Sequence, residues 1–298
     1  MRSLMPRQLL VFQAVCDHGS FSAAAEAVGL TQPAVTKSIQ ALEAQLGVKL
    51  FERGASGFHE TRAAKVLRRR VRWILREIEL VDDELRARNE MFDGHLTIGA
   101  NPVWATRFLP RILPAIYEAF PKLTLDVTVG SGESLIPLLN EGHLDMFFGL
   151  LPEPRAKSHI MQLHMFDVEV VLFARADHPI HAGAPTTLAA VWDYPWVAFS
   201  KHYELDRRIE QLATEFDLPP KRFSLTSMSI ASLVTLSQQT DHIVFAVDQL
   251  GSHMEENGFA PVPIDVPLLS FSTGAMVRAS IEELDPVRMF LTEIRKLD

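Results

Sequence analysis

The sequence predicts a mixed α/β protein in three parts: a small helical head, one long helix and an α/β body. Three patterns indicate this division. Short helical patterns separated by glycines fill residues 7–46, a heptad pattern free of glycine and proline runs through residues 62–92, and strand-like segments alternate with helical ones after Gly94. With 298 residues, 47% of them apolar, the chain is long enough to bury more than one core.

Charge is divided unevenly along the chain, whose formal net charge is −8. Residues 1–76 carry +7, from 12 Lys and Arg against 5 Asp and Glu, and residues 77–298 carry −15. This division predicts that only the head meets a polyanion, although charge alone is weak support for DNA binding. No apolar run is long enough to span a membrane, and Cys16 is the only cysteine. We therefore expect a cytoplasmic protein with no membrane contact, no disulfide within the chain and no cysteine-based zinc site.

The head has the pattern of a helix-turn-helix. Apolar residues at helical spacing predict helices over residues 7–18 and 21–28, and Gly29 supplies the turn to a third helix. Thr31 is the expected cap of this third helix, and Pro33 falls in its first turn, where a missing N–H costs nothing. The expected core and capping positions are Leu9, Phe12, Cys16, Ser20 or Ser22, Val35, Ile39, Leu42 and Leu46.

Polar side chains are left on the outward side of the third helix. Amide and hydroxyl groups can reach base edges in a major groove, and lysine can meet guanine or a phosphate. A polar helix face is usually only solvated, so the assignment rests on the helix-turn-helix pattern within a basic segment. Residues 49–61 then predict a hairpin, or wing. The residues expected at DNA are Ser22, Thr31, Gln32, Pro33, Thr36, Lys37, Gln40 and Arg53.

The long helix carries an apolar residue at every a and d position for three heptads. A single helix cannot bury such a stripe in water, so we expect a homodimer through residues 64–85, with packing on its own head as the alternative. An arginine run over residues 68–76 is expected to be solvated or salt-bridged rather than bound to phosphate. The stripe consists of Ala64, Leu67, Val71, Ile74, Ile78, Val81 and Leu85.

The body shows two series of alternating strands and helices, which predict parallel sheets with right-handed crossovers. The expected strands cover residues 95–100, 123–129, 145–150, 168–174, 196–199, 223–227, 242–247 and 268–277. Ligands of such sheets bind at the carboxyl ends of strands and the N-termini of helices. The candidate cleft residues are Asn101, Pro102, Ser131, Gly132, Ser134, Phe148, Ser200, Lys201, His202, Met228, Ser229 and Val247.

Small hydroxyls and helix-start N–H groups in this candidate cleft suit a carboxylate, with Lys201 as the counter-charge. Ser134 and Ser229 are equally well explained as helix caps alone. The chain has 11 histidines but no HExxH, and it has no GxSxG or GxxxxGK[ST] motif, so neither an enzyme nor a metal site nor a cofactor is expected. A solute-binding protein is the remaining alternative, but such proteins are exported and this chain has a DNA-binding head where a signal peptide would lie.

Residues 19–61 closely resemble the winged helix-turn-helix of LysR-type transcriptional regulators. The resemblance rests on the Ala-rich second helix, Thr-Gln-Pro-Ala-Val from Thr31, Leu-Glu shortly before Leu-Gly, and Leu-Phe-Glu-Arg from Leu50. Two departures affect base preference and the detail of the wing. Thr36-Lys37 stand where Ser-Arg is common, and His59-Glu60 replace an apolar residue and leucine.

The resemblance extends over the whole chain in length and domain order. It implies a winged helix-turn-helix over residues 1–61, a linker and dimerisation helix over 62–92, and an effector domain over 93–298 with the fold of periplasmic solute-binding proteins. Lobe I of that domain would comprise residues 93–166 and 267–298, and lobe II residues 167–266. The implied function is transcriptional regulation by a homodimer or tetramer that binds a specific sequence of double-stranded DNA and recruits RNA polymerase. A small organic acid would control this regulator.

Overall fold

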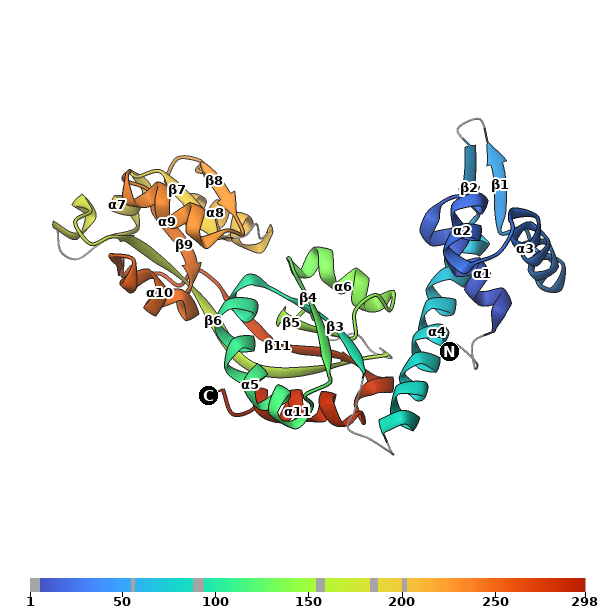
Figure 1. The fold of residues 1–298 in the computed structure, drawn as a ribbon. Helices are drawn as coiled ribbons and strands as arrows, with labels where there is room; N and C mark the ends of the chain where they lie inside the picture. The colour runs from blue at the N-terminus through green and yellow to red at the C-terminus, as the bar shows by residue number, and fades with distance from the viewer. Residues whose placement is uncertain are drawn as a thin grey trace.

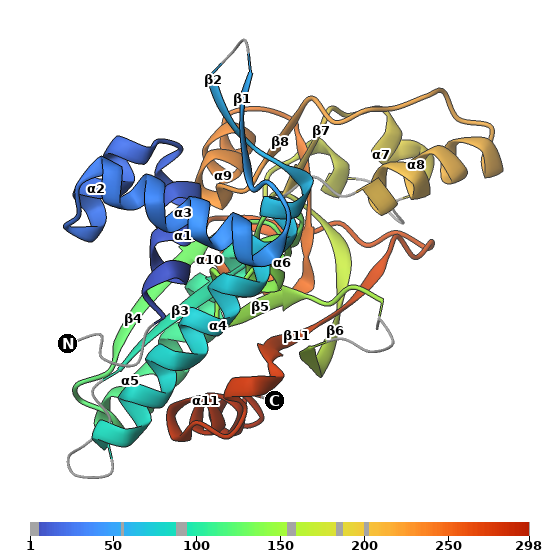
Figure 2. The ribbon, with the colours of Figure 1, turned by 90° about the vertical axis from the view of Figure 1, so that its right-hand side faces the viewer.

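The computed structural model describes residues 6–54, 57–87, 94–153, 159–182, 187–199 and 203–297. They form a helical head with a two-stranded hairpin, a long helix, and an α/β body (Figure 1). The long helix lies between the head and the body in Figure 1, and in the view turned by 90° it crosses in front of the body (Figure 2). Within the described residues, no helix is both long enough and apolar enough to span a membrane.

Three helices form the head: α1 (Arg7–His18), α2 (Phe21–Val28) and α3 (Gln32–Leu46). Their bounds agree with the sequence prediction, because each apolar run stops at a glycine. The apolar faces meet in one core, in which the side chains of Phe12 and Val35 are fully buried. This core fixes the orientation of α3 and leaves its other face to solvent.

The turn between α2 and α3 is built largely as predicted. Gly29 ends α2 with a φ of 69°, a left-handed conformation that a side chain would strain. Ser20 caps α2, since its Oγ accepts a hydrogen bond from the amide of Ala23 at 3.0 Å. Thr31 occupies the N-cap position of α3 as predicted, but its side chain makes no capping hydrogen bond. Pro33 lacks an N–H, so the start of α3 has one donor fewer to satisfy.

The wing follows α3, with β1 (Phe51–Gly54) antiparallel to β2 (Gly57–Glu60). A buried carboxylate ties it to the helix. Oε1 of Glu43, a residue 8% exposed, accepts hydrogen bonds from the backbone amides of Leu50 at 2.8 Å and Phe51 at 3.3 Å. The Leu-Glu of the sequence motif therefore positions the first strand of the wing relative to α3.

We expect Glu43→Ala to destabilise the head by about 2–4 kcal/mol, because two buried amides lose their acceptor. Hydrogen exchange at Leu50 and Phe51 should become faster, and mass spectrometry can measure it. Lys49→Ala is the matched control: Lys49 Nζ lies 2.6 Å from Glu43 Oε2, but its side chain is 70% exposed, so the variant should cost less than about 1 kcal/mol. Equal exchange in the parent and Glu43→Ala would show that the amides do not depend on this carboxylate.

The first half of the apolar stripe of the long helix α4 (Arg62–Ala87) is buried against the head of the same chain. Ala64, Leu67 and Val71 pack in the core of the head. The prediction of one unbroken stripe for a partner is therefore wrong over this half, where the alternative of packing on the head holds. The physical reason is that three short helices enclose a core only when α4 closes one side of it. Farther along, Ile74 is 46% exposed.

The body contains one continuous path of strands in the order β4-β3-β5-β11-β6-β9-β7-β8, with β10 paired to β6. The strands are β3 (His95–Ala100), β4 (Thr124–Val129), β5 (Met146–Leu150), β6 (Ile160–Arg175), β7 (Trp196–Phe199), β8 (Leu225–Ser227), β9 (Ile243–Val247), β10 (Phe259–Pro261) and β11 (Ser270–Arg278). The first three pair in parallel in what we term lobe I, and β7, β8 and β9 do so in lobe II. The antiparallel strands β6 and β11 pair with each other, and β6 continues from lobe I into lobe II.

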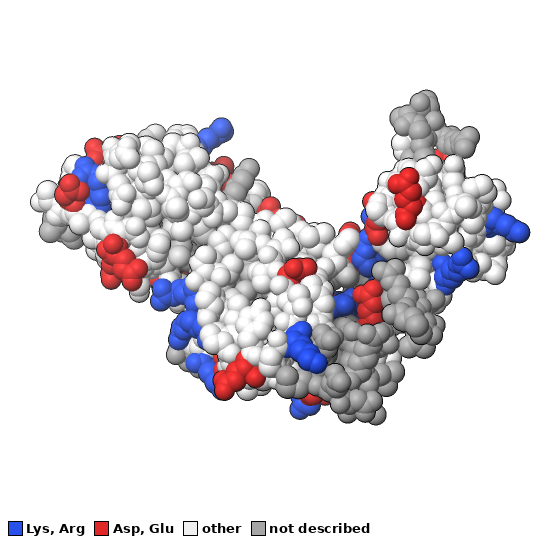
Figure 3. All heavy atoms as spheres, in the orientation of Figure 1, with Lys and Arg blue, Asp and Glu red and all other residues white. Residues whose placement is uncertain are grey.

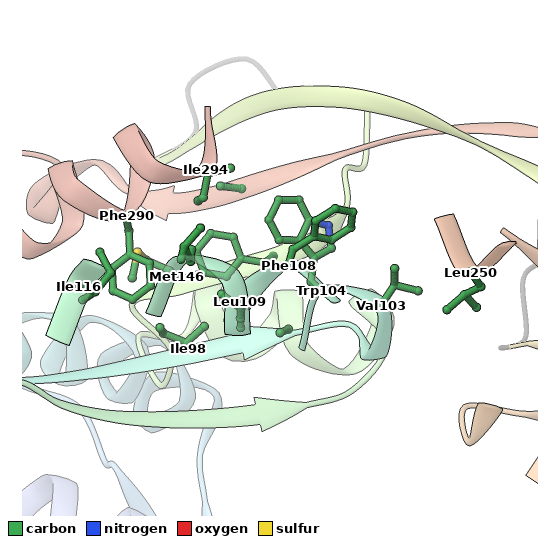
Figure 4. Packing of buried hydrophobic residues seen from close by; sticks show 14 of the residues in the cluster. Ile98, Val103, Trp104, Phe108, Leu109, Ile116, Met146, Leu250, Phe290 and Ile294 are labelled. Carbon is green, nitrogen blue, oxygen red and sulfur yellow. The ribbon is translucent and has the colours of Figure 1, made fainter. Parts of the chain in front are cut away.

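Helices cover both lobes (Figure 2). Their bounds are η1 (Trp104–Phe108), α5 (Leu109–Ala119), α6 (Gly132–Asn140), η2 (Pro179–Ala182), α7 (Leu188–Trp192), α8 (Tyr203–Glu215), α9 (Ile230–Gln238), η3 (Asp248–Leu250), α10 (Gly251–Glu256), η4 (Ala279–Ile281) and α11 (Asp285–Ile294). In lobe I, Ile98 and Met146 on the strands pack with Ile116 of α5 and Phe290 of α11 (Figure 4). The C-terminal helix thus completes the first lobe, as the sequence predicts.

Two elements differ from their predicted form. The strand expected over residues 168–174 is β6, which begins at Ile160 and has 16 residues, because one strand serves both lobes. The sequence pattern over residues 104–120 predicts one helix, but this segment begins instead as the π-helical turn η1. Pro110 cannot donate the amide hydrogen bond that would continue a regular α-helix through this turn.

Candidate DNA interface and ligand cleft

The predicted recognition face lies on the exposed side of α3. Val35 and Ile39 point into the core, whereas Gln32, Lys37 and Gln40 are exposed. At 15 residues the helix is about 22 Å long, enough to present a row of side chains to a major groove. The remaining two predicted positions on this helix are the exposed Pro33 and the half-buried Thr36.

The other predicted DNA contacts lie outside α3 in the sequence. Ser22 and Thr31 are exposed, in the first turn of α2 and at the N-cap position of α3. Arg53 belongs to β1, but its side chain lies outside the part of the structure that is described. Basic side chains are visible over the α3 side of the head (Figure 3).

Two arginines of α4 form ion pairs with carboxylates of the head. Arg68 lies 2.9 Å from Glu60 and 3.2 Å from Asp17, and Arg72 lies 2.7 Å from the same Asp17 oxygen. These ion pairs confirm the salt-bridged interpretation for this part of the run. They join α1, the end of the wing and α4 into one unit, while residues 69–70 are exposed.

A cleft of about 960 Å³ lies between the lobes, within the size range of small-molecule sites. The end of β3 and the start of α6 form one side, β9 and the loop before α9 form the other, and β6 and β11 run along it. Much of its surface is apolar. The aromatic side chains that line it are Trp104, Phe108, Phe166, Phe199, Phe245 and Phe271.

Six of the predicted cleft residues lie together in this lining. Two of them also have structural roles: Oδ1 of Asn101 accepts a hydrogen bond from the amide of Trp104 at 2.9 Å, and Oγ of Ser131 caps α6. These roles hold the side chains at the edge of the cleft in fixed orientations. The six residues are Asn101, Pro102, Ser131 and Gly132 from lobe I and Met228 and Val247 from lobe II.

Three other predicted cleft residues that the structure describes are not part of the lining. Phe148 is fully buried, with its ring stacked at 5.4 Å from that of Trp104, which covers it. The Oγ of Ser134 donates to the backbone oxygen of Ser131 at 2.8 Å, and Ser229 caps α9. The helix-cap interpretation is therefore sufficient for Ser229, but it is wrong for Ser134, because the cap of α6 is Ser131. Ser200, Lys201 and His202 lie outside the described residues.

The sequence prediction missed the contributions of β6 and β11. Gln162, His164 and Phe166 on β6, and residues 270–273 on β11, line the cleft. The predicted positions lay at the ends of parallel strands and at the starts of helices. The chain crosses between the lobes twice, near residues 167 and 267. These crossings could have identified the missed lining residues, because a strand that passes from one lobe to the other must run along the cleft between them.

Charged groups in the cleft are mainly acidic. Glu133, Glu153 and Glu204 line it, and among the lining residues that the structure describes none is Lys or Arg. His164 Nε2 lies 3.0 Å from Asp167 Oδ1 at its edge, and this contact, with a hydrogen bond from Ser272, lowers the pKa of Asp167. No group of three or more His, Cys, Asp or Glu side chains suited to a metal occurs in the described part of the chain.

The fold and these two sites are those of a DNA-binding protein that carries a cleft for a small molecule. Residues 89–297 match the family described as the LysR substrate binding domain. Residues 6–65 match the bacterial regulatory helix-turn-helix proteins of the lysR family. The chain belongs to the LysR family, as its head motif predicts.

The chain is 34% identical over 171 residues to a probable hydrogen peroxide-inducible genes activator of Streptomyces viridosporus. This match covers 57% of this chain and 54% of that protein. It is 30% identical over 212 residues to the SDS degradation transcriptional activation protein of a Pseudomonas species, covering 70% and 68%. The full-length regulator CbnR in complex with its target DNA has a TM-score of 0.63 at 22% identity, covering 98% of this chain and 99% of that one. The first match spans about half of its relative, and the similarity to CbnR shows the fold.

Proposed function

We propose that the protein is a LysR-type transcriptional regulator that binds a specific DNA site through its head and changes its output when a small molecule occupies the cleft. The observation that carries this proposal is the cleft of about 960 Å³ in a body joined through one helix to a helix-turn-helix head. Such a ligand regulates only if it binds two arrangements of the protein with different affinity. Catalysis is not part of the proposal.

At DNA, we propose that α3 lies in the major groove. Gln32 and Gln40 would read base edges through their amides, and Lys37 would meet guanine or a phosphate. Ser22 and Thr31 would contact the backbone beside the groove, with Arg53 in the wing at the flanking backbone or minor groove. The exposure of the described side chains in this set supports the assignment.

The proposed ligand is a small organic acid with an apolar body. Ser131 and Gly132 at the start of α6 supply the hydroxyl and helix-start environment that favours a carboxylate, and the aromatic rings suit the remainder. Glu133, Glu153 and Glu204 would repel a second acid group. We therefore propose a monocarboxylate that also carries an amine or hydroxyl donor.

Some matched relatives are named for hydrogen peroxide, and this chain offers little for that chemistry. Cys16 is its only cysteine, so no disulfide can form within these 298 residues. The thiol is buried in the head, and burial, together with the charge of Glu60, raises its pKa to about 12. The reactive thiolate is then scarce at neutral pH, and we do not propose this thiol as a peroxide sensor.

The proposed assembly is a homodimer through the α4 region of residues 64–85, with a tetramer as the larger form. Ile74 and Val81, each 46% exposed, remain for a partner after the first half of the stripe has packed on the head. Such a dimer would bind a two-fold-related DNA site in the cytoplasm and contact RNA polymerase there.

A thermal-shift screen of the full chain tests the ligand class. Among aromatic and aliphatic monocarboxylates, their hydroxy and amino derivatives, and dicarboxylates, we expect only substituted monocarboxylates to raise the unfolding temperature. Val247→Trp, which adds an indole ring to the lining of the cleft, should abolish the shift. Val129→Trp is the control, because Val129 is 54% exposed on β4 and does not line the cleft.

Two results would contradict the proposal. A compound that stabilises the parent and Val247→Trp equally binds outside the cleft. Stabilisation by dicarboxylates alone would show that the glutamates do not govern the choice of ligand.

A further inference from the structure

The body is held against α4 by an ion-pair cluster that the DNA and ligand assignments do not use. The guanidinium of Arg76 donates to both oxygens of Asp145, with Nε at 3.1 Å and Nη2 at 2.7 Å. The same Nη2 donates to the backbone oxygen of His95 at 2.6 Å. Asp145 is 1% exposed. Burial would raise its pKa, but the hydrogen bonds and charge of Arg76 hold that pKa below its ordinary value.

A second arginine closes the cluster from the side of the body. Arg278 has no exposed surface, and its Nη2 lies 3.4 Å from Asp145 and 3.2 Å from Glu77 of α4. The hydroxyl of Ser280 donates to the same oxygen of Glu77 at 2.6 Å. Each side of the contact therefore supplies one acid and one arginine, which specifies how the two surfaces align.

An aromatic side chain packs beside these charges. Trp73 of α4 donates from its Nε1 to the backbone oxygen of Asn140 at 3.0 Å. Gly142 makes room for the ring: it has a φ of 78°, and a Cβ there would lie 2.8 Å from Cδ1 of Trp73. The guanidinium of Arg278 lies 5.6 Å from the ring centre. Arg72, which pairs with Asp17 in the head, also contacts His143 of the body.

The body residues that bind Arg76 and Glu77 of α4 lie at the ends of three neighbouring strands of lobe I. His95 begins β3, Asp145 directly precedes β5, and Arg278 ends β11. The other ends of the same strands line the cleft through Asn101, Leu150 and residues 270–273. Because β3 and β5 have six and five residues, about 20 Å of rigid backbone separates the α4 contact from the cleft.

We infer that Asp145 and Arg278 are positioning residues, which hold the body in one orientation on α4 through Arg76 and Glu77. The head is rigidly joined to α4 by its core, so this contact also sets where the cleft stands relative to DNA. The inference rests on the proposed function for its biological meaning, but the orientation itself does not depend on a ligand.

The test measures the distance between two spin labels within one chain. Cysteines replace the exposed Lys65 on α4 and the exposed Glu118 on α5, in a Cys16→Ala background. Labelled chains are mixed with an excess of unlabelled ones, so that only distances within a chain contribute. The full chain without ligand should give one narrow distance distribution.

Arg76→Gln combined with Glu77→Gln should at least double the width of this distribution while the unfolding temperature of the body stays within about 3 °C, as expected for a contact outside its core. Arg76→Lys as a single substitution keeps the positive charge, so the distance distribution of this variant should stay nearly as narrow as that of the parent. Arg70→Gln is the control at an exposed position of the same helix and should leave the distribution unchanged.

An unchanged distribution in the Arg76→Gln and Glu77→Gln chain would overturn the inference, and so would equal broadening by Arg70→Gln. Neither measurement involves a ligand. A failed ligand screen with a broadened distribution would therefore count against the proposed function and leave this inference standing.

Discussion

Replacing Gln32 and Lys37 together with alanine is expected to lower the affinity of the full chain for its selected DNA site by at least about 100-fold. Both side chains are exposed on the face of α3 opposite Val35 and Ile39, so their loss removes base and phosphate contacts without opening the core. The site is obtained by selecting binders from random duplexes. Affinity is then measured by fluorescence anisotropy at one fixed salt concentration, because phosphate contacts depend on salt.

The matched control is Gln45→Ala combined with Lys65→Ala. Both residues are exposed, but Gln45 lies in the last turn of α3 and Lys65 lies on α4. This variant carries the same change of charge and should bind within about threefold of the parent, since only distributed electrostatics change. Equal losses in the two double variants would show that α3 does not read the DNA and that only net charge matters.

Trp104→Ala is expected to destabilise the body by about 3–5 kcal/mol. The indole is 1% exposed, lines the cleft and packs in the core of lobe I, where Figure 4 shows it beside Phe108. Its ring packs at 4.9 Å from that of Phe108 and is stacked with Phe166 at 6.2 Å, and its Nε1 donates to Oγ1 of Thr273 at 2.8 Å. Urea unfolding followed by far-UV circular dichroism measures the change.

Two milder variants separate packing from hydrogen bonding at this position. Trp104→Phe keeps an aromatic ring, and Thr273→Val leaves the indole N–H without its acceptor, so each should cost about 1–3 kcal/mol. If Trp104→Ala costs no more than Thr273→Val, the stacked rings contribute little, and this wall of the cleft is held by another part of the core.

The head could be predicted from sequence almost residue by residue. Its helices are short, each is bounded by a glycine such as Gly29, and their apolar spacing is regular, so local rules decide the outcome. Eight strands of the body could be predicted from their apolar patterns, apart from their ends, but the three-residue β10 was not predicted. The absence of a capping hydrogen bond at Thr31 could not be predicted, because whether a side chain forms a cap depends on its rotamer and not on its type.

The long-range features were harder to predict. The apolar stripe of α4 does not indicate whether Ala64 and Val71 pack on the head of the same chain or on a second chain, since either arrangement would bury the same surface. The predicted cleft residues lay at strand ends and helix starts, and His164 and Phe166 were missed because the position of β6 depends on how two lobes share one strand. The pairing of Arg76 with Asp145 joins residues 69 positions apart, and no local pattern specifies it.

The most direct test of the account is the affinity of the full chain for its selected DNA site, measured with and without a monocarboxylate that stabilises the chain. We predict that the compound changes the affinity or the length of protected DNA, and that Val247→Trp removes this change while Val129→Trp keeps it. If a compound bound in the cleft leaves both the affinity and the protected length unchanged, the cleft does not control DNA binding and the proposed function is wrong.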